Sequence, residues 1–329
     1  MMEEKWNLIF GVGRVGGMFY REILRKNEKV FGIEKRKFEN FFVKVGGSSE
    51  KLEVEIFEKI PKERKISFVF FCVKNPIDEI FEDFCYNLKE AKIFPEAIFF
   101  PQNGLQIREK AILKIKKVFG ALSRKIDLLR IILLNSIDKK EKENKIEISY
   151  SHPVKIVLAK FWGEKNRLTF YANYLKKFDF KVYEFKRNDV ENLEYSKLFL
   201  NLIGLYCAAK NLSIEEGFSK KDIFEKEILS LKEYINCVQK NNGKFVNLPG
   251  YPVSIFAFLI KNLPLPFVSL FRREIGKIVE KKREKKPKDI SEIDFYTGAV
   301  VKLGEKVKLQ TPVNKEIFEI LKSKWIGKN

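Results

Sequence analysis

Short apolar runs alternate with longer, more polar segments in the first 122 residues of the chain. The runs are residues 6–10, 30–33, 68–73, 97–100 and 118–122. Continuous apolar runs of this length are typical of strands buried on both faces of a parallel sheet. The segments between them have the length of helices or polar loops, so the pattern predicts an α/β domain with a doubly wound sheet.

Between residues 130 and 185 the apolar runs lie closer together. They are 131–134, 146–150, 154–159 and 181–185. We expect these runs to add antiparallel strands to the same sheet, with one helix at 167–178.

Beyond residue 187 the periodicity becomes that of amphipathic helices. Apolar residues recur every three or four positions in 190–209, 222–238, 290–307 and 313–321. This spacing is typical of helices packed in a bundle, and Pro312 suits the first turn of the last one. The chain is therefore expected to divide into an α/β domain, residues 1–187, and an all-helical domain, residues 188–329.

The motif Gly11-Val12-Gly13-Arg14-Val15-Gly16 directly follows the first expected strand and opens a helix. Gly11 permits a tight turn, Gly13 lets the backbone approach a pyrophosphate, and Gly16 allows the helix to pack closely on the strand. The N–H groups at the helix N-terminus favour bound phosphates. In this context the motif predicts a Rossmann-type dinucleotide-binding domain whose cofactor contacts all six residues.

The end of the second expected strand selects between cofactors. It reads Glu34-Lys35-Arg36-Lys37. A cation at this position holds the 2′-phosphate of NADP, whereas an acid favours the ribose hydroxyls of NAD. The three consecutive cations predict NADPH bound through Lys35 and Arg36. Because of Glu34, NADH stays the alternative cofactor.

Polar residues also follow two further expected strands. Lys74 comes after the run 68–73, and Asn103 comes after the run 97–100. Ligands of open α/β sheets bind beyond the carboxyl ends of strands, which favours a functional interpretation. A surface lysine and an Asn-Gly turn are the structural alternatives.

In the helical half, Lys197 and Asn201 lie four residues apart and so share one helix face. Together they could bind an anionic substrate and protonate a developing alkoxide. A pairing of Lys197 with Glu194 is equally compatible with the sequence. Glu292 and Asp294 open a later helix, where capping alone would explain both acids.

The charge balance does not point to nucleic acid. The chain has 64 Lys and Arg against 44 Asp and Glu, a net charge of +20. The excess is spread over both expected domains, with 39 cations against 26 acids in residues 1–187 and 25 against 18 in residues 188–329. A binding groove would concentrate it instead.

The chain lacks the residues that several other classes of protein need. Cys72, Cys85, Cys207 and Cys237 are widely spaced, which predicts free thiols and a reducing, cytoplasmic location without a metal site. The N-terminus does not resemble a signal peptide, and polar and proline residues interrupt the apolar segment 251–271, so no membrane span is expected. His152 is the sole histidine, so a hydride-transfer enzyme would need lysine, glutamate or water as its proton donor.

Taken together, these motifs resemble those of the ketopantoate reductase (2-dehydropantoate 2-reductase) family. The resemblance rests on GVGRVGG, CVKN around Lys74, PQNG around Asn103, EYSKLFLN from Glu194 to Asn201, and SEIDFYTGAVVKLGEKVKLQTPVN from Ser291 to Asn314. It implies a Rossmann domain that binds NADPH, a helical domain that closes over it, and a 2-oxo acid in the cleft. A homodimer is compatible with it.

The resemblance also implies roles for individual residues. Lys197 would be the general acid that protonates the C2 oxygen, and Glu292 would position the substrate hydroxyl. Asn201 would contact the substrate. Lys74 and Asn103 would lie near the nicotinamide and the reacting carbon, and Lys35 would bind the 2′-phosphate of the cofactor.

Two departures from the family pattern leave the identity of the 2-oxo acid undetermined. Leu205 stands where family members often have asparagine, and 280–287 lacks the serine that usually holds the substrate carboxylate. The alternatives are a reductase or dehydrogenase of another small 2-oxo acid, and a regulatory protein that binds a dinucleotide without turnover.

Overall fold

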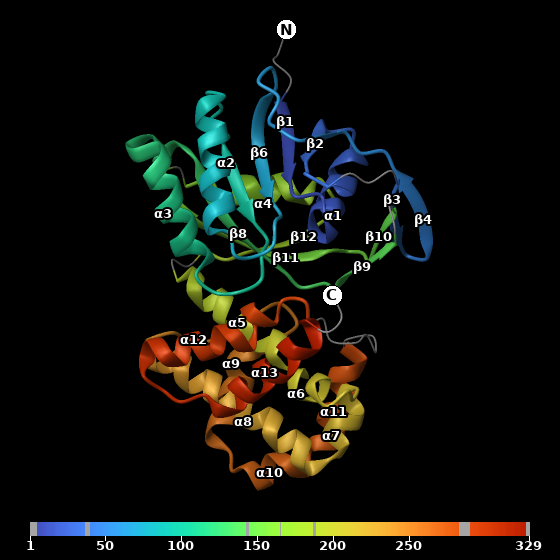
Figure 1. Cartoon of the computed structure of the whole chain (residues 1–329), viewed down its shortest axis with the longest axis vertical. Helices are drawn as coiled ribbons and strands as arrows, with labels where there is room; N and C mark the ends of the chain where they lie inside the picture. The colour runs from blue at the N-terminus through green and yellow to red at the C-terminus, as the bar shows by residue number, and fades with distance from the viewer. Residues whose placement is uncertain are drawn as a thin grey trace. The chain divides into compact units, whose positions relative to one another are not determined.

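The computed structural model describes residues 5–36, 40–142, 145–164, 166–186, 189–282 and 290–326. Two compact units are present (Figure 1): Met1–Gln102 with Gln106–Val190, and Asn103–Leu105 with Glu191–Asn329. The boundary expected between 187 and 188 lies outside the described residues. The predicted fold class is confirmed, because the first unit is built on a sheet and the second on helices.

The main sheet of the first unit has the strand order of a doubly wound fold. In sheet order its strands are β12 (Lys181–Glu184), β11 (Lys155–Trp162), β8 (Asp127–Leu133), β7 (Ala97–Phe100), β6 (Lys65–Phe71), β1 (Lys5–Phe10), β2 (Val30–Ile33) and β5 (Ile56–Phe57). The strands from β8 to β5 are parallel. The strand order reverses between β1 and β6, the point at which such sheets bind ligands.

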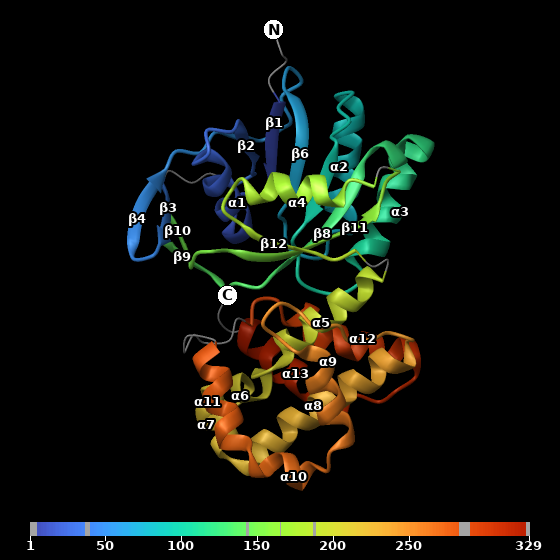
Figure 2. The same ribbon diagram turned by 180° about the vertical axis from the view of Figure 1, so that it is seen from behind.

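Helices cover both faces of this sheet. Phe68 and Phe70 of β6 belong to a core shared with α1 (Arg14–Leu24) and α4 (Leu168–Lys176), which crosses the sheet in Figure 2. The intervening Val69 and Phe71 belong to the core shared with α2 (Asp78–Glu90) and α3 (Ile107–Phe119). This alternation explains why the strand reads as one continuous apolar run.

Three expectations for this unit are wrong, of which the first two concern the main sheet. Residues 118–122 form the end of α3 and the start of the short helix η1 (Gly120–Lys125), since Val118 and Phe119 continue the buried face of α3 and Gly120 ends it at φ +54. The later strands are also not uniformly antiparallel. β11 runs antiparallel to β8, but β8 is parallel to β7 and β12 is parallel to β11.

A second sheet contains the run 146–150, which we had expected in the main sheet. Its strand order is β4 (Ser48–Leu52), β3 (Asn40–Val45), β10 (Lys145–Tyr150) and β9 (Ile137–Lys142). Phe41 and Ile148 pack in the core shared with α1, close enough that Gly17 has no room for a side chain. The sheet thereby supports α1 from the side.

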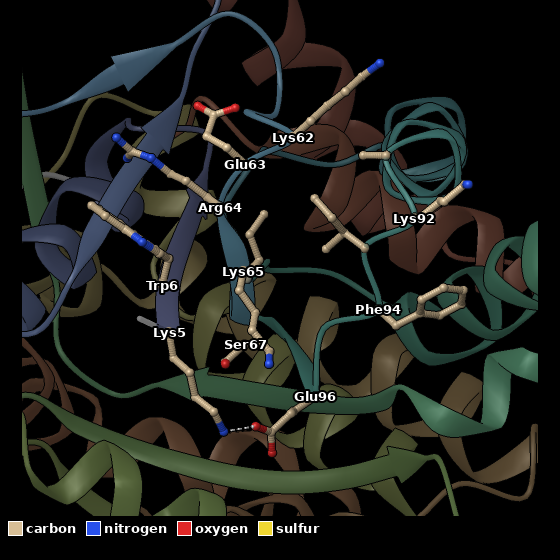
Figure 3. A pocket seen from close by; sticks show the side chains of 13 residues that line it. Lys5, Trp6, Lys62, Glu63, Arg64, Lys65, Ser67, Lys92, Phe94 and Glu96 are labelled. Carbon is tan, nitrogen blue, oxygen red and sulfur yellow. Dashed lines mark hydrogen bonds and ion pairs between the residues drawn. The ribbon is translucent and has the colours of Figure 1, made fainter. Parts of the chain in front are cut away.

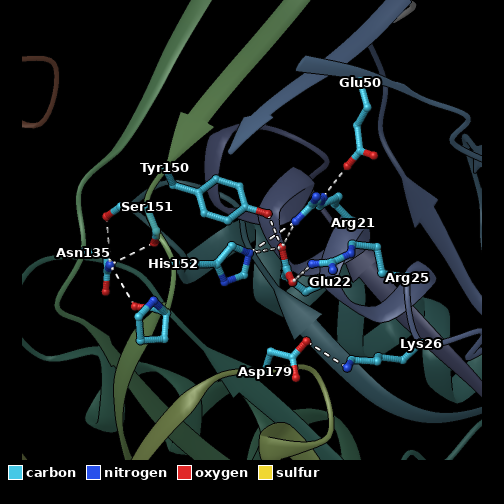
Figure 4. Close-up of polar contacts among 11 residues, drawn as sticks. Arg21, Glu22, Arg25, Lys26, Glu50, Asn135, Tyr150, Ser151, His152 and Asp179 are labelled. Atoms are coloured by element: carbon cyan, nitrogen blue, oxygen red, sulfur yellow. Dashed lines mark hydrogen bonds and ion pairs between the residues drawn. The ribbon is translucent and has the colours of Figure 1, made fainter. Parts of the chain in front are cut away.

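A buried polar cluster joins α1 to this sheet (Figure 4). The carboxylate of Glu22, 1% exposed, accepts hydrogen bonds from Arg21 at 2.6 Å and from the hydroxyl of Tyr150, and lies 3.2 Å from His152 Nε2. Arg21 also donates to Glu50 of β4 at 2.5 Å. Burial and the neighbouring Glu22 carboxylate raise the pKa of Tyr150. His152 thus belongs to a structural cluster.

The second unit is a helical bundle in its described part. Its helices are α5 (Val190–Leu202), α6 (Leu205–Ala209), α7 (Ile214–Ser219), α8 (Lys221–Lys240), α9 (Val253–Asn262), α10 (Leu265–Leu270), α11 (Arg272–Lys282), η2 (Ile293–Phe295), α12 (Thr297–Val307) and α13 (Pro312–Ile326). Pro312 opens α13 as predicted. No helix among the described residues combines the length and apolarity needed to cross a bilayer.

Two helices differ from their expected extent. The expected helix 190–209 is interrupted at Gly204, which has φ +87. The buried carboxylate of Glu227 on α8 compensates for the break by accepting the backbone N–H groups of Gly204 and Tyr206 at 2.6 and 2.9 Å. The helix expected from residue 290 begins at Thr297, after η2.

Candidate active site

The glycine-rich turn has the shape that the motif predicts. Gly11 follows β1 at φ +92, and a Cβ there would lie 3.0 Å from the side chain of Val73. A Cβ on Gly16 would clash with the carbonyl oxygen of Gly11 and lie 3.0 Å from Ile9. Both glycines are therefore required by the local packing of α1 against β1 and β6.

The N-terminus of α1 is suited to an anion. The helix begins at Arg14, no side chain caps it, and no acidic residue lies in its first turn. A Cβ on Gly13 would have Arg36 at 3.7 Å as its nearest neighbour, so this glycine is not needed for internal packing. These features fit a dinucleotide whose pyrophosphate approaches Gly13 and the N–H groups of the first turn of α1.

The two valines of the motif are packed inward. Val12 is fully buried and fills the space beside Gly32 of β2, while Val15 packs against the core of the α1 face. Only their backbones remain suited to the predicted cofactor contact.

Glu34 and Arg36 form an ion pair at the end of β2. The guanidinium of Arg36 donates to the Glu34 carboxylate at 3.1 and 3.3 Å, and the Arg36 backbone N–H donates to it at 3.2 Å. Hydrogen bonding to Glu34 raises the pKa of Arg36. The acid that favours NADH and the cation that favours NADPH therefore neutralise each other, while Lys35 is exposed and Lys37 lies outside the described residues.

Lys74 is exposed and follows β6, the strand next to β1 in the sheet. Because these two strands are parallel, Lys74 and the glycine-rich turn leave the sheet at the same edge. Within the first unit, the predicted cofactor residues therefore gather at the carboxyl ends of β1, β2 and β6.

In the second unit, residues from three distant parts of the sequence form a hydrogen-bonded set. Asn103 donates from Nδ2 to Oε2 of Glu292 at 2.7 Å, and Asn201 Nδ2 donates to Asn103 Oδ1 at 3.4 Å. The hydroxyl of Tyr296 donates to the same Glu292 oxygen at 3.0 Å. The structure thus joins three of the predicted substrate residues, with Asn103 bonded to both Glu292 and Asn201.

Lys197 lies one helical turn before Asn201 on α5 and is half-buried. Glu292 is 8% exposed, immediately before η2, and Asp294 is paired with Lys322 at 2.8 Å. The two acids of this motif therefore differ in their surroundings. Asp294 has a partner at the surface, whereas Glu292 faces the amide of Asn103.

Two positions escaped sequence reasoning. Tyr296, which supports Glu292, is recognisable only as an aromatic residue four positions after the acid. Arg130 of β8 is 1% exposed, and its guanidinium donates to the carbonyl oxygens of Phe100 and Gln102, both at 2.6 Å. It fixes the chain just before Asn103, and its signal was a single arginine inside the apolar run of β8.

The structure places the first departure from the family pattern and only the beginning of the second. Leu205 is 1% exposed at the start of α6, where it belongs to the core of the second unit. Glu280 is buried and its carboxylate accepts the backbone N–H of Ile214 at 3.1 Å. Residues 283–289, which make up most of the charged segment, lie outside the described residues.

A cavity of about 740 Å³ lies at the end of the main sheet opposite to the glycine-rich turn (Figure 3). It is lined by the amino ends of β1 and β6 and by the segment after α2. Its Arg64 is bound to Glu55 at 2.5 and 2.8 Å and stacks on Trp6 at 3.9 Å, so this cation is already engaged. None of the predicted site residues lines it.

Within the described ranges, no cluster of His, Cys, Asp and Glu side chains could hold a metal ion. The four cysteines are free, and Cys85, Cys207 and Cys237 are buried. Burial raises the pKa of each of these thiols, which makes them unreactive packing residues.

Comparison with known families supports the resemblance found in the sequence. Residues 273–324 match the family model described as the ketopantoate reductase PanE/ApbA C-terminal domain. The segment from Ser291 to Asn314, on which much of the resemblance rests, lies within this match. The resemblance to ketopantoate reductases is therefore confirmed. No curated protein sequence matches the chain.

Solved structures share the fold over nearly the whole chain. The 2-dehydropantoate 2-reductase of Geobacter metallireducens is 17% identical, with 97% of this chain and 99% of that chain covered and a TM-score of 0.66. A D-mandelate dehydrogenase with NADH and anilino(oxo)acetate is 13% identical, with 97% of each chain covered and a TM-score of 0.66. The dimeric ketopantoate reductase of Staphylococcus aureus is 13% identical, with 98% and 100% covered and a TM-score of 0.63. At these identities the likeness establishes the fold.

Proposed function

We propose that this chain is an NADPH-dependent reductase of a branched 2-oxo acid, with 2-dehydropantoate as the first candidate and pantoate as its product. The main support is the hydrogen-bonded set of Asn103, Asn201, Glu292 and Tyr296. A nearly buried carboxylate held by an amide and a tyrosine hydroxyl, with a second amide behind the first, is suited to hold a small polar molecule in one orientation.

The first unit would hold the dinucleotide. Gly13 would accommodate the pyrophosphate, the N-terminus of α1 would stabilise its charge, and Lys35 and Arg36 would bind the 2′-phosphate. Lys74 would contact the cofactor beyond β6. When bound, the nicotinamide supplies the hydride that C2 of the substrate accepts.

The second unit would hold and protonate the substrate. Glu292 would accept a hydrogen bond from the substrate hydroxyl, and Tyr296 would hold its carboxylate in place. Asn103 and Asn201 would orient the oxo acid through their amides. Lys197 would donate its proton from Nζ to the C2 oxygen as the hydride arrives, so that the product leaves as an alcohol.

A second candidate is a reductase of another 2-oxo acid that uses NADH. It is supported by the D-mandelate dehydrogenase, whose structure contains NADH and an oxoacetate, and by the Glu34 carboxylate at the end of β2. A dinucleotide-binding regulator without turnover is the alternative outside the enzymes.

We also propose a homodimer, supported by the description of the S. aureus ketopantoate reductase as dimeric. The free, buried cysteines support a cytoplasmic location. A partnership with nucleic acid is not proposed, because the cationic excess is spread over both expected domains.

The decisive experiment combines both cofactors with a panel of 2-oxo acids. The purified full-length protein is given NADPH or NADH with 2-dehydropantoate, phenylglyoxylate, 2-oxoisovalerate or pyruvate, and cofactor oxidation is followed by absorbance. NADPH oxidation that requires 2-dehydropantoate supports the first candidate, and a preference for another acid supports the second. Tight cofactor binding without turnover of any of these acids would support the dinucleotide-binding regulator.

A further inference from the structure

The cavity at the amino ends of β1 and β6 has an excess of positive charge among the described residues that line it. Its charged side chains are the cations Lys5, Lys62, Arg64, Lys65 and Lys92 and the acids Glu63 and Glu96. Five cations against two acids give this lining a net charge of +3. Its volume of about 740 Å³ is that of a small-molecule site, and a concave surface of one sign attracts ligands of the opposite sign.

The cations that face a ligand lie on one side of this cavity. On the other side, the Glu96 carboxylate accepts hydrogen bonds from Lys5 at 3.0 Å and from Arg167 at 3.2 Å, so its negative charge is balanced. Lys62 and Lys92 are both exposed. Figure 3 shows their side chains extending on the side of the cavity beside α2. An anion would therefore meet these two ammonium groups.

The end of α2, from which Lys92 follows, does not oppose an anion strongly. The last carbonyl groups of a helix carry partial negative charge. Here the backbone N–H groups of Lys92 and Ile93 donate to the carbonyl oxygens of Lys89 and Leu88 at 3.0 and 2.9 Å. These bonds occupy the carbonyl oxygens at the helix end, which weakens their repulsion of a negative charge.

Phe94 adds an uncovered aromatic surface to the same cavity. Its side chain is 46% exposed, and its ring packs edge to face on Phe119 at 5.6 Å. The ring of Trp6, across β6 in Figure 3, is covered by the guanidinium of Arg64 at 3.9 Å. Nucleic acid bases stack on exposed aromatic rings, and lysines bind phosphates as point charges. The lining therefore suits a molecule that carries both a planar ring and phosphate.

We propose that this cavity binds a mononucleotide, at a site separate from that of the dinucleotide cofactor. The base would pack on Phe94, and the phosphates would bind Lys62 and Lys92. The cavity lies at the amino ends of β1 and β6, whereas the glycine-rich turn and Lys74 follow the carboxyl ends of the same strands. The two ligands would occupy opposite ends of one pair of strands, so binding here is independent of the proposed reaction.

The test is a calorimetric titration of the full-length protein with ADP, in saturating NADPH so that the proposed cofactor site is filled. Lys62→Glu and Lys92→Glu each reverse a charge of the cavity, and Lys51→Glu on β4, also exposed, is the matched control. We expect one ADP per chain, a Kd about tenfold or more higher in each cavity variant, and no change in the control. Circular dichroism verifies that each variant is folded.

The base and the phosphates are tested separately. Phe94→Ala should raise the Kd of ADP about fivefold or more, because the stacking surface is lost. Pyrophosphate and adenosine should each bind about tenfold or more weakly than ADP. Pyrophosphate that binds as tightly as ADP, or an unchanged Kd in Phe94→Ala, overturns the assignment to a nucleotide.

The remaining outcomes distinguish this site from others. ADP binding that NADPH abolishes belongs to the cofactor site and overturns the second site, as do equal Kd values in the cavity and control variants. A single-stranded oligonucleotide that binds more tightly than ADP, and loses affinity in the same variants, overturns the mononucleotide in favour of nucleic acid. A chain that fails to bind NADPH contradicts the proposed function instead, and the same ADP titrations without NADPH then decide the proposal.

Discussion

Asn103 and Glu292 are 189 residues apart in the sequence and are joined by a hydrogen bond of 2.7 Å from Nδ2 to Oε2. The amide oxygen of Asn103 is in turn 3.4 Å from the amide of Asn201. An asparagine that donates to an acid and accepts from a second amide has its side-chain orientation fixed. The arrangement makes Glu292 the acceptor at the centre of the proposed substrate site.

Replacing Glu292 by glutamine should lower kcat/KM by about 10- to 100-fold, because a hydrogen bond to a charged acceptor is worth about 1.5–3 kcal/mol. Cofactor affinity, measured by fluorescence titration, should stay within about twofold. Asp294→Asn is the matched control, since that carboxylate is 48% exposed and bound to Lys322. Equal losses in the two variants would contradict the assigned role of Glu292.

Lys197→Met should lower kcat by about 10²- to 10⁴-fold, the scale expected for a general acid. The nearly isosteric side chain removes the transferable proton, and the dissociation constant of the cofactor should change little. Stopped-flow measurement of a single turnover reports the hydride step directly. Lys226→Met on α8, whose lysine pairs with Glu316 at 3.2 Å, controls for loss of a cation from the same unit. Near-normal turnover of Lys197→Met would refute the role.

The Glu34–Arg36 pair predicts opposite shifts in cofactor preference. Removing both Lys35 and Arg36 by alanine substitution should weaken NADPH about tenfold more than NADH, because the 2′-phosphate loses its charge-assisted hydrogen bonds. Glu34→Ala releases Arg36 from the carboxylate and should favour NADPH. The ratio of the two dissociation constants is the measured quantity. Equal weakening of both cofactors would count against recognition of the 2′-phosphate.

Gly13 and Gly16 should respond differently to alanine. Gly16→Ala should cost several kcal/mol of unfolding free energy, since its Cβ would clash with Gly11. Gly13→Ala should cost about 1 kcal/mol or less, yet raise the cofactor dissociation constant about tenfold or more by obstructing the pyrophosphate. Denaturant titration and cofactor titration separate the two effects. Retained cofactor affinity in a stable Gly13→Ala protein would place the phosphates elsewhere.

Acid should weaken the ion pair between Glu55 and Arg64. Hydrogen bonding to Arg64 lowers the pKa of Glu55 below its ordinary value of 4.5. The pair therefore stabilises the fold fully above that value, and the contribution is lost as the pH falls through the lowered pKa. Since Glu55 is about half exposed, we expect less than about 1 kcal/mol between wild type and Glu55→Gln at pH 7. Urea titrations should show this difference shrinking at pH 3.5, and a constant difference would contradict it.

The parts of the fold that follow from local pattern were predictable. The run 68–73 is apolar on both faces, and Gly11, Gly13 and Gly16 stand at fixed spacing after a strand, so the main sheet and its turn could be derived from adjacent residues. The second sheet could not, because β4 and β9 are made mostly of polar residues and β3 pairs with a strand beyond residue 140. β4 and β9 exist through tertiary pairing rather than through a local apolar signal, whereas the run 146–150 in β10 indicated a strand but not the sheet to which it belongs.

The same distinction applies to the candidate site. Lys197 and Asn201 could be placed together because four residues separate them on one helix. That Asn103 would meet Glu292, or that Tyr296 would support the acid, depends on how distant segments pack. The tyrosine has no local signature, whereas Arg130 could have been found, since a charge inside a buried strand requires partners.

The second sheet joins an early part of the chain to a late one. Asn40 of β3 lies opposite Lys145 of β10, which follows it by 105 residues. Because a ribosome delivers the chain from its N-terminus, Glu22 and the whole of α1 are synthesised well before Tyr150 and His152. The glycine-rich turn therefore emerges early, but the polar cluster that joins α1 to the second sheet is complete only when synthesis has reached the middle of the protein.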